Sequence, residues 1–457
     1  MNIPPSPFSR RDWLRTASAG FGYLAFAGLA AQSAARASAG PLSVKSPHFP
    51  SRAKRIIFLC MRGGPSHMET FDPKPALTAA HGQQGRLGKS KLLGSRWGFR
   101  KHGQSGTEIV ELLPEIGRHA DKLCVLRGMH TDNENHPQAL EQLHTGSFQF
   151  IRPSMGAWAV YGLGTENQSL PGFISINPLT ALGGLRYYSS SFLPAACSAT
   201  LLGNASMPPK ELKLGDLTNP RITAASQRAQ LDLLQGMNRD LLAKTADPRV
   251  EGLIESYELA FRMQGELPGV MNLDGESPKT LELYGADKGD TQTFGRQCLL
   301  ARRFAEAGVR FIEITHTDWD LHGFLTGGMT KNCRQIDKPI AGLLQDLDQR
   351  GLLADTLVLW GGEFGRTPED PTTDGRGHNN KGYCMWMTGG GVKGGHVHGA
   401  TDDLGYEAVD GKIHIHDLHA TMLHLLGLDH EKLTYRHGGR DFRLTDVKGN
   451  VVKEILS

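Results

Sequence analysis

The sequence lacks paired cysteines and the motifs of common redox cofactors. Its six cysteines are scattered, and no two of them form a Cys-x-x-Cys pair. This spacing argues against a disulfide framework, an iron–sulfur cluster and attached haem. Cys60 and Cys124 lie in apolar runs typical of buried strands, and no Gly-x-Gly-x-x-Gly motif follows the first run. We therefore expect free thiols in the core and no dinucleotide or haem cofactor.

The sequence also lacks a long run of charge of one sign. Its 50 Lys and Arg residues nearly balance its 47 Asp and Glu residues, which leaves a net charge of +3. Neither sign forms the stripe or tail that marks a nucleic-acid groove, so we expect no nucleic-acid partner. Residues 40–457 are many for one domain, but α/β enzymes of this size often fold as one unit. We expect a single domain.

The N-terminal region lacks a run apolar enough for a secure membrane span. Residues 16–34 are mostly Ala and Gly, and small residues follow them. The pair Arg10-Arg11 precedes this run within Ser-Arg-Arg-Asp-Trp-Leu. These features predict a twin-arginine signal peptide over residues 1–39, with a retained N-terminal anchor as the alternative. We expect the twin-arginine translocase as a partner during export, a periplasmic or secreted protein, and no stable membrane span after cleavage.

Apolar runs alternate with helical patterns along most of the remaining chain. This alternation predicts an α/β fold with a doubly wound, mostly parallel sheet and helices on both faces. The region 150–290 is less regular, and its helical stretch 224–263, interrupted near Pro248, suggests a helical insertion around 200–290. The predicted strands are 55–61, 123–126, 173–176, 310–314, 356–360 and 383–388, and the other predicted helices are 137–143, 293–307, 331–350 and 418–426.

Polar clusters follow four of the predicted strands. In sheets of this class the chemistry lies beyond the carboxyl ends of the strands. Four such loops at strand ends are unlikely to arise by chance, so we expect them to form one functional site. The clusters are residues 66–72, 130–136, 316–322 and 361–366.

The third cluster has the donor types of a metal site. Asp318, Asp320 and His322 place two carboxylates and one imidazole within five residues, a mixture that zinc, manganese or iron accepts. A hydrogen-bonded turn is the alternative interpretation of the same residues. His378 lies in a Gly-rich loop, where a core histidine is not expected, and this favours contact with a metal or a substrate.

The fourth cluster contributes a carboxylate and a guanidinium. Glu363 has small neighbours that allow backbone and ligand to approach closely. It is a candidate metal ligand, or else a capping or salt-bridged carboxylate. Arg366 could bind an anionic substrate through two hydrogen bonds, or could pair with a local carboxylate. Histidines also recur between residues 416 and 437, where an amphipathic helix with a polar histidine face is the simpler explanation.

Several motifs occur in one order along the chain after the leader. They are Gly-Gly-Pro-Ser-His (63–67), Phe-Asp-Pro-Lys-Pro (71–75), Trp-Asp-Leu-His (319–322), Gly-Glu-Phe-Gly-Arg-Thr-Pro (362–368), His-Asp-Leu-His-Ala-Thr (416–421) and Tyr-Arg-His-Gly-Gly-Arg-Asp (435–441). With these motifs the chain resembles the exported "domain of unknown function 1501" (DUF1501) family. That family in turn resembles the alkaline phosphatase and sulfatase superfamily, which implies a doubly wound sheet and a pair of divalent metals at its strand ends.

The resemblance implies roles for individual residues. The Asp-x-x-x-His metal motif of the superfamily corresponds to Asp318 and His322, and its late single histidine ligand corresponds to His378. Two positions depart from the pattern. The carboxylate expected after the first strand is replaced by residues 61–64, Met-Arg-Gly-Gly, and a later Asp-His pair becomes Glu-Phe at 363–364.

The position of the sulfatase nucleophile also differs in this sequence. Counting back ten residues from the Gly of the Thr-Gly pair 145–146, as the sulfatase pattern requires, leads to His136, and no Cys-x-Pro-Ser-Arg motif occurs. His136 could ligate metal, act as general acid or base, or attack phosphorus. Thr131, Ser66 and Thr70 are other candidate nucleophiles or turn and capping hydroxyls. Water activated by a metal ion would need none of them.

Two functions are consistent with these residues. The first is an exported metal-dependent hydrolase of phosphate or sulfate esters, acting on a small-molecule or glycan ester. In it Asp318, Asp320, His322, Glu363 and His378 hold a divalent ion, with Zn²⁺ favoured over Mn²⁺, Fe²⁺ or Ca²⁺. The catalytic candidates are His136, Arg366 and Thr131. The second function is a non-catalytic member of the fold that binds an anionic glycan or a partner protein.

Overall fold

Strand β1 (Arg55–Met61) runs through the middle of the main sheet, and all of its residues are buried. The structure is a computed structural model that describes residues 40–457 except 87, 89, 181–183, 204–220 and 246. The predicted signal peptide, residues 1–39, lies outside the described residues. The unbroken apolar run of β1 predicted a central strand with these bounds, and that prediction is confirmed.

The described part of the chain forms a main sheet of nine strands in the order β14-β5-β13-β9-β1-β8-β6-β7, with β17 beside β5. Strand β13 is antiparallel to both of its neighbours, and the other pairings in this sheet are parallel. The strands are β1, β5 (Cys124–His130), β6 (Phe173–Ile176), β7 (Thr200–Leu202), β8 (Phe311–His316), β9 (Thr356–Gly361), β13 (Tyr383–Thr388), β14 (His396–His398) and β17 (Ile413–His414).

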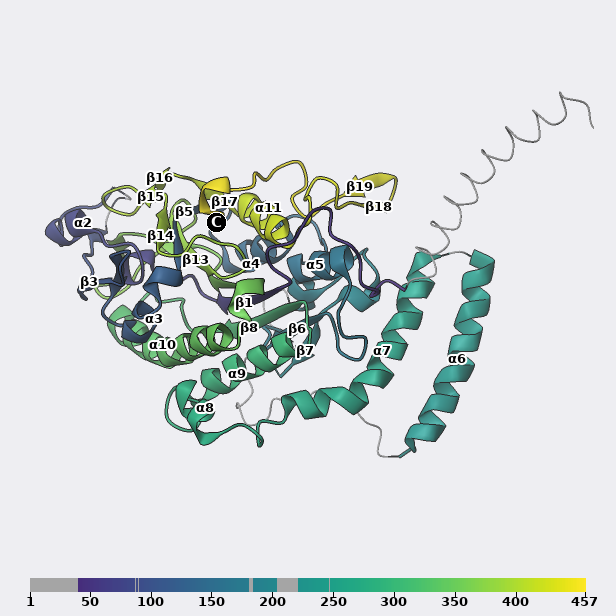
Figure 1. The fold of residues 1–457 in the computed structure, drawn as a ribbon. Helices are drawn as coiled ribbons and strands as arrows, with labels where there is room; N and C mark the ends of the chain where they lie inside the picture. Colours follow the sequence, from purple (N-terminus) through teal and green to yellow (C-terminus); the bar gives the residue numbers. More distant parts are fainter. Residues whose placement is uncertain (1–39, 87, 89, 181–183, 204–220, 246) are drawn as a thin grey trace, which may run out of the picture.

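Helices cover both faces of this sheet. Figure 1 shows α9 and α10 on one side of β1 and β8, and α4, α5 and α11 on the other. The predicted α/β class with a mostly parallel sheet between helices is therefore confirmed. The helices are α2 (Pro75–Ala79), α3 (Pro114–Gly117), α4 (His136–Thr145), α5 (Met155–Leu163), α6 (Ala224–Thr245), α7 (Pro248–Met271), α8 (Pro278–Leu283), α9 (Gln292–Glu306), α10 (Leu325–Gln349) and α11 (Ile415–Leu425).

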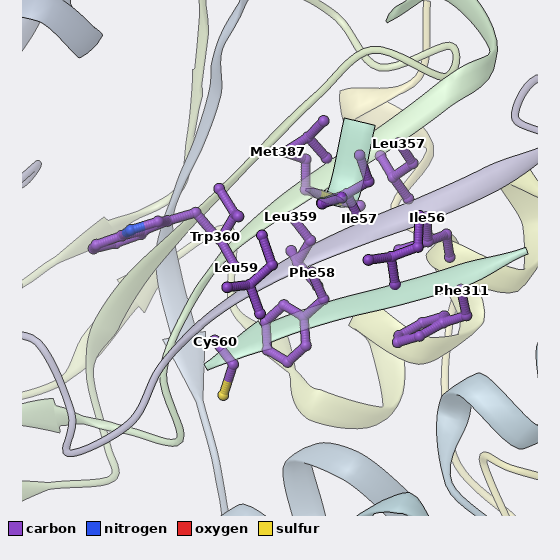
Figure 2. Packing of buried hydrophobic residues seen from close by; sticks show 14 of the residues in the cluster. Ile56, Ile57, Phe58, Leu59, Cys60, Phe311, Leu357, Leu359, Trp360 and Met387 are labelled. Atoms are coloured by element: carbon purple, nitrogen blue, oxygen red, sulfur yellow. The ribbon is translucent and has the colours of Figure 1, made fainter. Parts of the chain in front are cut away.

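Side chains alternate between the two faces at the centre of the sheet. Phe58 and Cys60 extend to one side of β1 and Ile57 to the other, among neighbours from β8, β9 and β13 (Figure 2). The ring of Phe58 lies 6.0 Å from that of His144 on α4, so the face that carries Phe58 and Cys60 is the face that α4 covers. All six cysteines are buried and free, as predicted.

Helices α6 and α7 pack on each other as a hairpin that projects from the body of the protein (Figure 1). Together with α8 they lie in the region 200–290, where the sequence predicted helical structure; residues 204–220 and 246 of that region are outside the described part. Within the described residues, no helix is both long enough and apolar enough to span a membrane.

Short strands pair outside the main sheet and shape the loops above it. Of these, β10 and β12 bring the segments of Arg366 and His378 side by side. The short strands are β2 (Lys91–Leu92), β3 (Phe99–His102), β4 (Thr107–Val110), β10 (Gly365–Arg366), β11 (Glu369–Asp370), β12 (His378–Asn379), β15 (Ala400–Thr401), β16 (Ala408–Asp410), β18 (Tyr435–His437) and β19 (Arg440–Phe442).

Candidate metal centre

Four strand ends meet at one edge of the sheet. Strand β1 is parallel to both β8 and β9. Strand β5 is antiparallel to β13, which is antiparallel to β9, so β5 runs in the same direction as β9. The loops after these four strands therefore leave the sheet at the same edge, as the sequence predicted from their polar residues.

Asp320 is the centre of this cluster. Its Oδ1 atom lies 3.1 Å from His136 Nε2, 3.1 Å from His322 Nε2 and 3.4 Å from His378 Nε2. It also lies 2.6 Å from a terminal guanidinium nitrogen of Arg366. One carboxylate oxygen offers about two lone pairs, so it cannot accept hydrogen bonds from all four nitrogen atoms at once.

Two of these imidazoles also face each other directly. His322 Nε2 and His378 Nε2 are 2.8 Å apart. Burial and the nearby positive charge of Arg366 lower the pKa of His322. Two nitrogen lone pairs this close need a proton or a cation between them. His136, Asp320 and His378 each offer a ligand atom within 4.8 Å of the others, so these donors fit a divalent ion bound by nitrogen and oxygen.

Glu363 orients His136 by binding the ring nitrogen that does not face Asp320. Its carboxylate is fully buried, and its Oε1 atom accepts a hydrogen bond from His136 Nδ1 at 2.6 Å. The main-chain N–H of Gly63 donates to both carboxylate oxygens, at 3.0 and 3.1 Å. A carboxylate only accepts, so Nδ1 carries the proton and Nε2 faces Asp320. A buried carboxylate that fixes the tautomer of an imidazole is the usual partner of a histidine ligand.

Hydrogen bonding sets the charge of the two central groups. Burial alone would lower the pKa of His136, but the neighbouring carboxylates of Asp320 and Glu363 raise it above the ordinary value. Partial burial would raise the pKa of Asp320, yet the nearby imidazoles of His136 and His378 and the guanidinium of Arg366 hold it well below its ordinary range. Asp320 is therefore ionised, as a metal ligand must be.

Arg366 holds the loops together. Its side chain is 1% exposed, and its donors reach the carbonyl oxygens of Gly63, Gly64 and Trp319 as well as Asp320. Of the two roles that the sequence left open for Arg366, pairing with a local carboxylate is the one present in the structure. Its donors are used within the protein, and little of the guanidinium faces solvent.

A second buried ion pair connects two of the loops. Arg376 and Glu69 are both fully buried, and Arg376 Nε donates to Glu69 Oε2 at 2.9 Å. The main-chain N–H of Arg376 donates to the carbonyl of Leu321, which lies between two of the candidate ligands. A Cβ atom at Gly375 would lie 1.9 Å from the carbonyl oxygen of His322, so glycine is required for this close approach. The sequence did not indicate this pair.

Two of the predicted site residues point elsewhere. The Asp318 carboxylate is exposed and pairs with Lys331 at 3.1 Å, and its backbone has a φ of +74°. The Thr131 hydroxyl donates to Gln142 Oε1 at 2.8 Å. Neither group has a hydrogen bond or ion pair to the Asp320 cluster among the described residues. The structure thus brings together Asp320, His322, His378, Glu363, Arg366 and His136 from the predicted set.

A second group of metal-type side chains lies deeper in the protein. Cys60, His144 and Glu313 are buried with their ligand atoms within 4.8 Å of one another. His144 Nδ1 donates to the carbonyl of Leu140 at 2.8 Å, and its Nε2 lies 3.2 Å from Glu313 Oε1. Burial would lower the pKa of His144, but Glu313 raises it. The contacts of His144 with Leu140 and Glu313 therefore account for its two ring nitrogen atoms without an ion.

The sequence matches the family described as "Protein of unknown function (DUF1501)" over residues 53–456. This match confirms the family that the motifs predicted. No curated protein matches the sequence.

Three solved structures show a distant similarity to this chain. The lipoteichoic acid synthase LtaP from Listeria monocytogenes is 10% identical, with a TM-score of 0.39 over 88% of this chain and 78% of that chain. The PsFucS1 sulfatase from Pseudoalteromonas sp. is 12% identical, with a TM-score of 0.39 over 83% and 69%. Alkaline phosphatase from the Antarctic bacterium TAB5 is 11% identical, with a TM-score of 0.30 over 76% and 93%. The family assignment therefore depends on the sequence match.

Proposed function

We propose that this chain, which belongs to the DUF1501 family, is an exported hydrolase of phosphate or sulfate esters that depends on a divalent metal ion. The observation that carries the proposal is the convergence of three imidazoles on one oxygen of Asp320. His136, Asp320, His322 and His378 are the proposed ligands. Three nitrogen donors and one oxygen donor favour Zn²⁺. The motif resemblance to the alkaline phosphatase and sulfatase superfamily supports ester hydrolysis as the reaction.

The surrounding residues have separate tasks in this proposal. A bound divalent ion would supply Lewis-acid activation of water and of the ester oxygen. Glu363 keeps the Nε2 lone pair of His136 directed at the ion, and Arg366 keeps Asp320 ionised and in place. The His322 side chain is 48% exposed, so substrate would approach from that side.

Arg62 is the residue that we assign to the anionic oxygen atoms of the substrate. Its main-chain N–H donates to the carbonyl of His316 at 2.9 Å, which continues the pairing of β1 with β8 by one residue. Strand alternation therefore places its side chain on the face of Cys60, beneath α4. The Arg62 side chain has no hydrogen bond or ion pair with any described residue, and its buried Nε atom has no partner. An unpaired guanidinium directly after β1, at the edge of the sheet where the proposed ligands lie, suits a sulfate or phosphate group.

Replacing Arg62 should weaken substrate binding. We expect Arg62→Ala to raise KM by about 10- to 100-fold, since a hydrogen bond to a charged group contributes about 1.5–3 kcal/mol. Arg62→Lys should recover part of this loss, because lysine restores the charge without the two-pronged geometry. Steady-state kinetics on the ester identified below would measure both. An unchanged KM in Arg62→Ala would remove this residue from the substrate site.

Replacing Glu363 should weaken metal binding without removing a ligand. In Glu363→Gln the amide no longer fixes His136 with a negative charge, and we expect the metal affinity to fall by about 10- to 100-fold. Competition with a chromogenic chelator would measure the affinity. Glu313→Gln is the matched control, because Glu313 is equally buried and pairs with a different histidine, His144. Equal affinities in the two variants would contradict the orienting role of Glu363.

The proposed function itself is tested on the protein purified after export. Elemental analysis should find at least one equivalent of a divalent metal. A panel of aryl and sugar phosphates and sulfates should reveal hydrolysis that a chelator abolishes and that added Zn²⁺ or Mn²⁺ restores. Stoichiometric metal without hydrolysis of any ester would favour the non-catalytic binding function. Absence of metal from protein never exposed to a chelator would reject the metal centre.

A further inference from the structure

A cavity of about 280 Å³ lies at the opposite end of α4 from His136. Gln142 and Thr145 of α4 line it, whereas His136 begins the helix, and ten helical residues span about 15 Å. Its other walls come from the chain after α4 and from the C-terminal segment around Phe442. The cavity is therefore separate from the candidate metal centre.

One wall of this cavity carries a cation held between aromatic rings. The Arg152 guanidinium carbon lies 5.0 Å from the ring centre of Phe150 and 4.6 Å from that of Phe442. Arg152 has no hydrogen bond or ion pair with any residue that the structure describes. The rings hold the planar group by cation–π contact and leave its N–H donors unused.

The other charged residues around the cavity already have partners. Asp446 pairs with Arg440 and acts on Arg152 only through space. Asp132 accepts from Gln142 and lies 3.2 Å from His414 Nε2. The remaining basic residues of the lining are each near a carboxylate: Arg443 is 3.2 Å from Glu431, and Lys448 is 3.7 Å from Asp132. Among the described residues that line the cavity, Arg152 is thus the cation whose N–H donors are available to an external anion.

The rest of the lining suits a ring with hydroxyl groups. Trp158, Phe192 and Phe442 supply aromatic surface, and the negative face of such a ring attracts the slightly positive C–H face of a sugar. His416 is 4% exposed and its Nδ1 atom has no hydrogen-bond partner. Pockets for drug-sized ligands begin at about 300 Å³, so this cavity has room for a single ring.

We propose that this cavity is a binding site for one anionic sugar unit, sulfated or phosphorylated, with Arg152 holding the anion and the aromatic rings holding the sugar face. The His416 imidazole lies within reach of a sugar hydroxyl. The site is independent of metal and of ester hydrolysis. It would let the protein hold one unit of an anionic glycan about one helix length away from the metal centre.

Isothermal titration calorimetry tests this site after the metal centre has been disabled. In the Asp320→Ala protein we expect glucose-6-sulfate and glucose-6-phosphate to bind with one-to-one stoichiometry. Adding Arg152→Gln should weaken both by at least about tenfold, because a charge-assisted hydrogen bond is lost. The matched control is Arg239→Gln on α6, an exposed arginine outside the cavity, which should leave binding unchanged.

The same titration includes results that would overturn the proposal. Neutral glucose that binds as tightly as its esters would show that Arg152 holds no anion. Inorganic sulfate that binds as tightly as glucose-6-sulfate would show that the aromatic wall contributes nothing. Absence of binding by either sugar ester, in protein whose unfolding temperature is unchanged, would reject the site. None of these results affects the proposed hydrolase, because they are measured without its metal ligand.

Discussion

Asp320→Ala is expected to lose its metal almost completely. Among the described residues, Asp320 is the one carboxylate within reach of all three imidazoles, those of His136, His322 and His378. Its removal leaves these imidazoles beside the buried positive charge of Arg366. Removing a residue that hydrogen-bonds to a metal ligand lowers the metal affinity by about 10- to 100-fold. Removing a direct ligand should therefore lower the metal affinity by more than about 100-fold. Elemental analysis of the purified variant should fall from at least one equivalent to a trace, and chelator-sensitive hydrolysis should disappear.

Asp318→Ala is the matched control for this experiment. Asp318 is a carboxylate in the same loop, two residues away, but it pairs with Lys331 and not with the histidines. The sequence pattern favoured both residues as ligands, and the structure directs only Asp320 at the histidines. We expect Asp318→Ala to retain its metal. Equal loss in both variants would mean that the loop rearranges around the ion, and equal retention would exclude Asp320 as a ligand.

Glu69→Gln is expected to cost the largest amount of stability. The substitution leaves the fully buried Arg376 guanidinium without its charged partner, and breaking a buried pair on one side costs about 3–5 kcal/mol. Urea unfolding would measure the loss in the free energy of unfolding. Asp441→Asn, which breaks the exposed pair with Arg436, should cost less than about 1 kcal/mol.

A double substitution separates charge from packing at this position. Glu69→Leu with Arg376→Met removes both charges, and apolar replacements of a buried pair are often close to neutral. We expect this variant to be more stable than Glu69→Gln alone. A Glu69→Gln protein that unfolds within about 1 kcal/mol of the wild type would show that solvent reaches Arg376 in the native state.

The sequence predicted strand bounds most accurately for strands that are buried along their whole length. Strands β1, β6 and β13 have the bounds that their apolar runs predicted, because each is buried along its whole length. The loops that form the site could be predicted, since parallel strands bring their carboxyl ends to one edge of the sheet. The sequence could not decide between Asp318 and Asp320, because the ion pair of Asp318 with Lys331 on α10 forms only in the folded protein.

Most features that the sequence did not indicate depend on contacts between residues far apart in the chain. Helix α10 begins at Leu325 rather than at the predicted residue 331, because the carboxylate of Asp374 accepts hydrogen bonds from the main chain and hydroxyl of Thr326. Arg366 likewise reaches carbonyl groups about three hundred positions earlier in the chain. Neither partner has a local signal, since both depend on loops that meet only in the folded protein.

The four strand ends that surround the proposed metal ligands can meet only after most of the chain has been synthesised. The contact between Gly63 and Glu363 joins groups 300 residues apart in sequence, and closing loops of that length is a slow, late event in folding. A nascent chain that has not yet reached β9 has three of the four loops, but no Glu363 or His378. In the proposed function, metal capture would then follow synthesis of nearly the whole chain, and the compartment in which folding finishes would determine which ion is available.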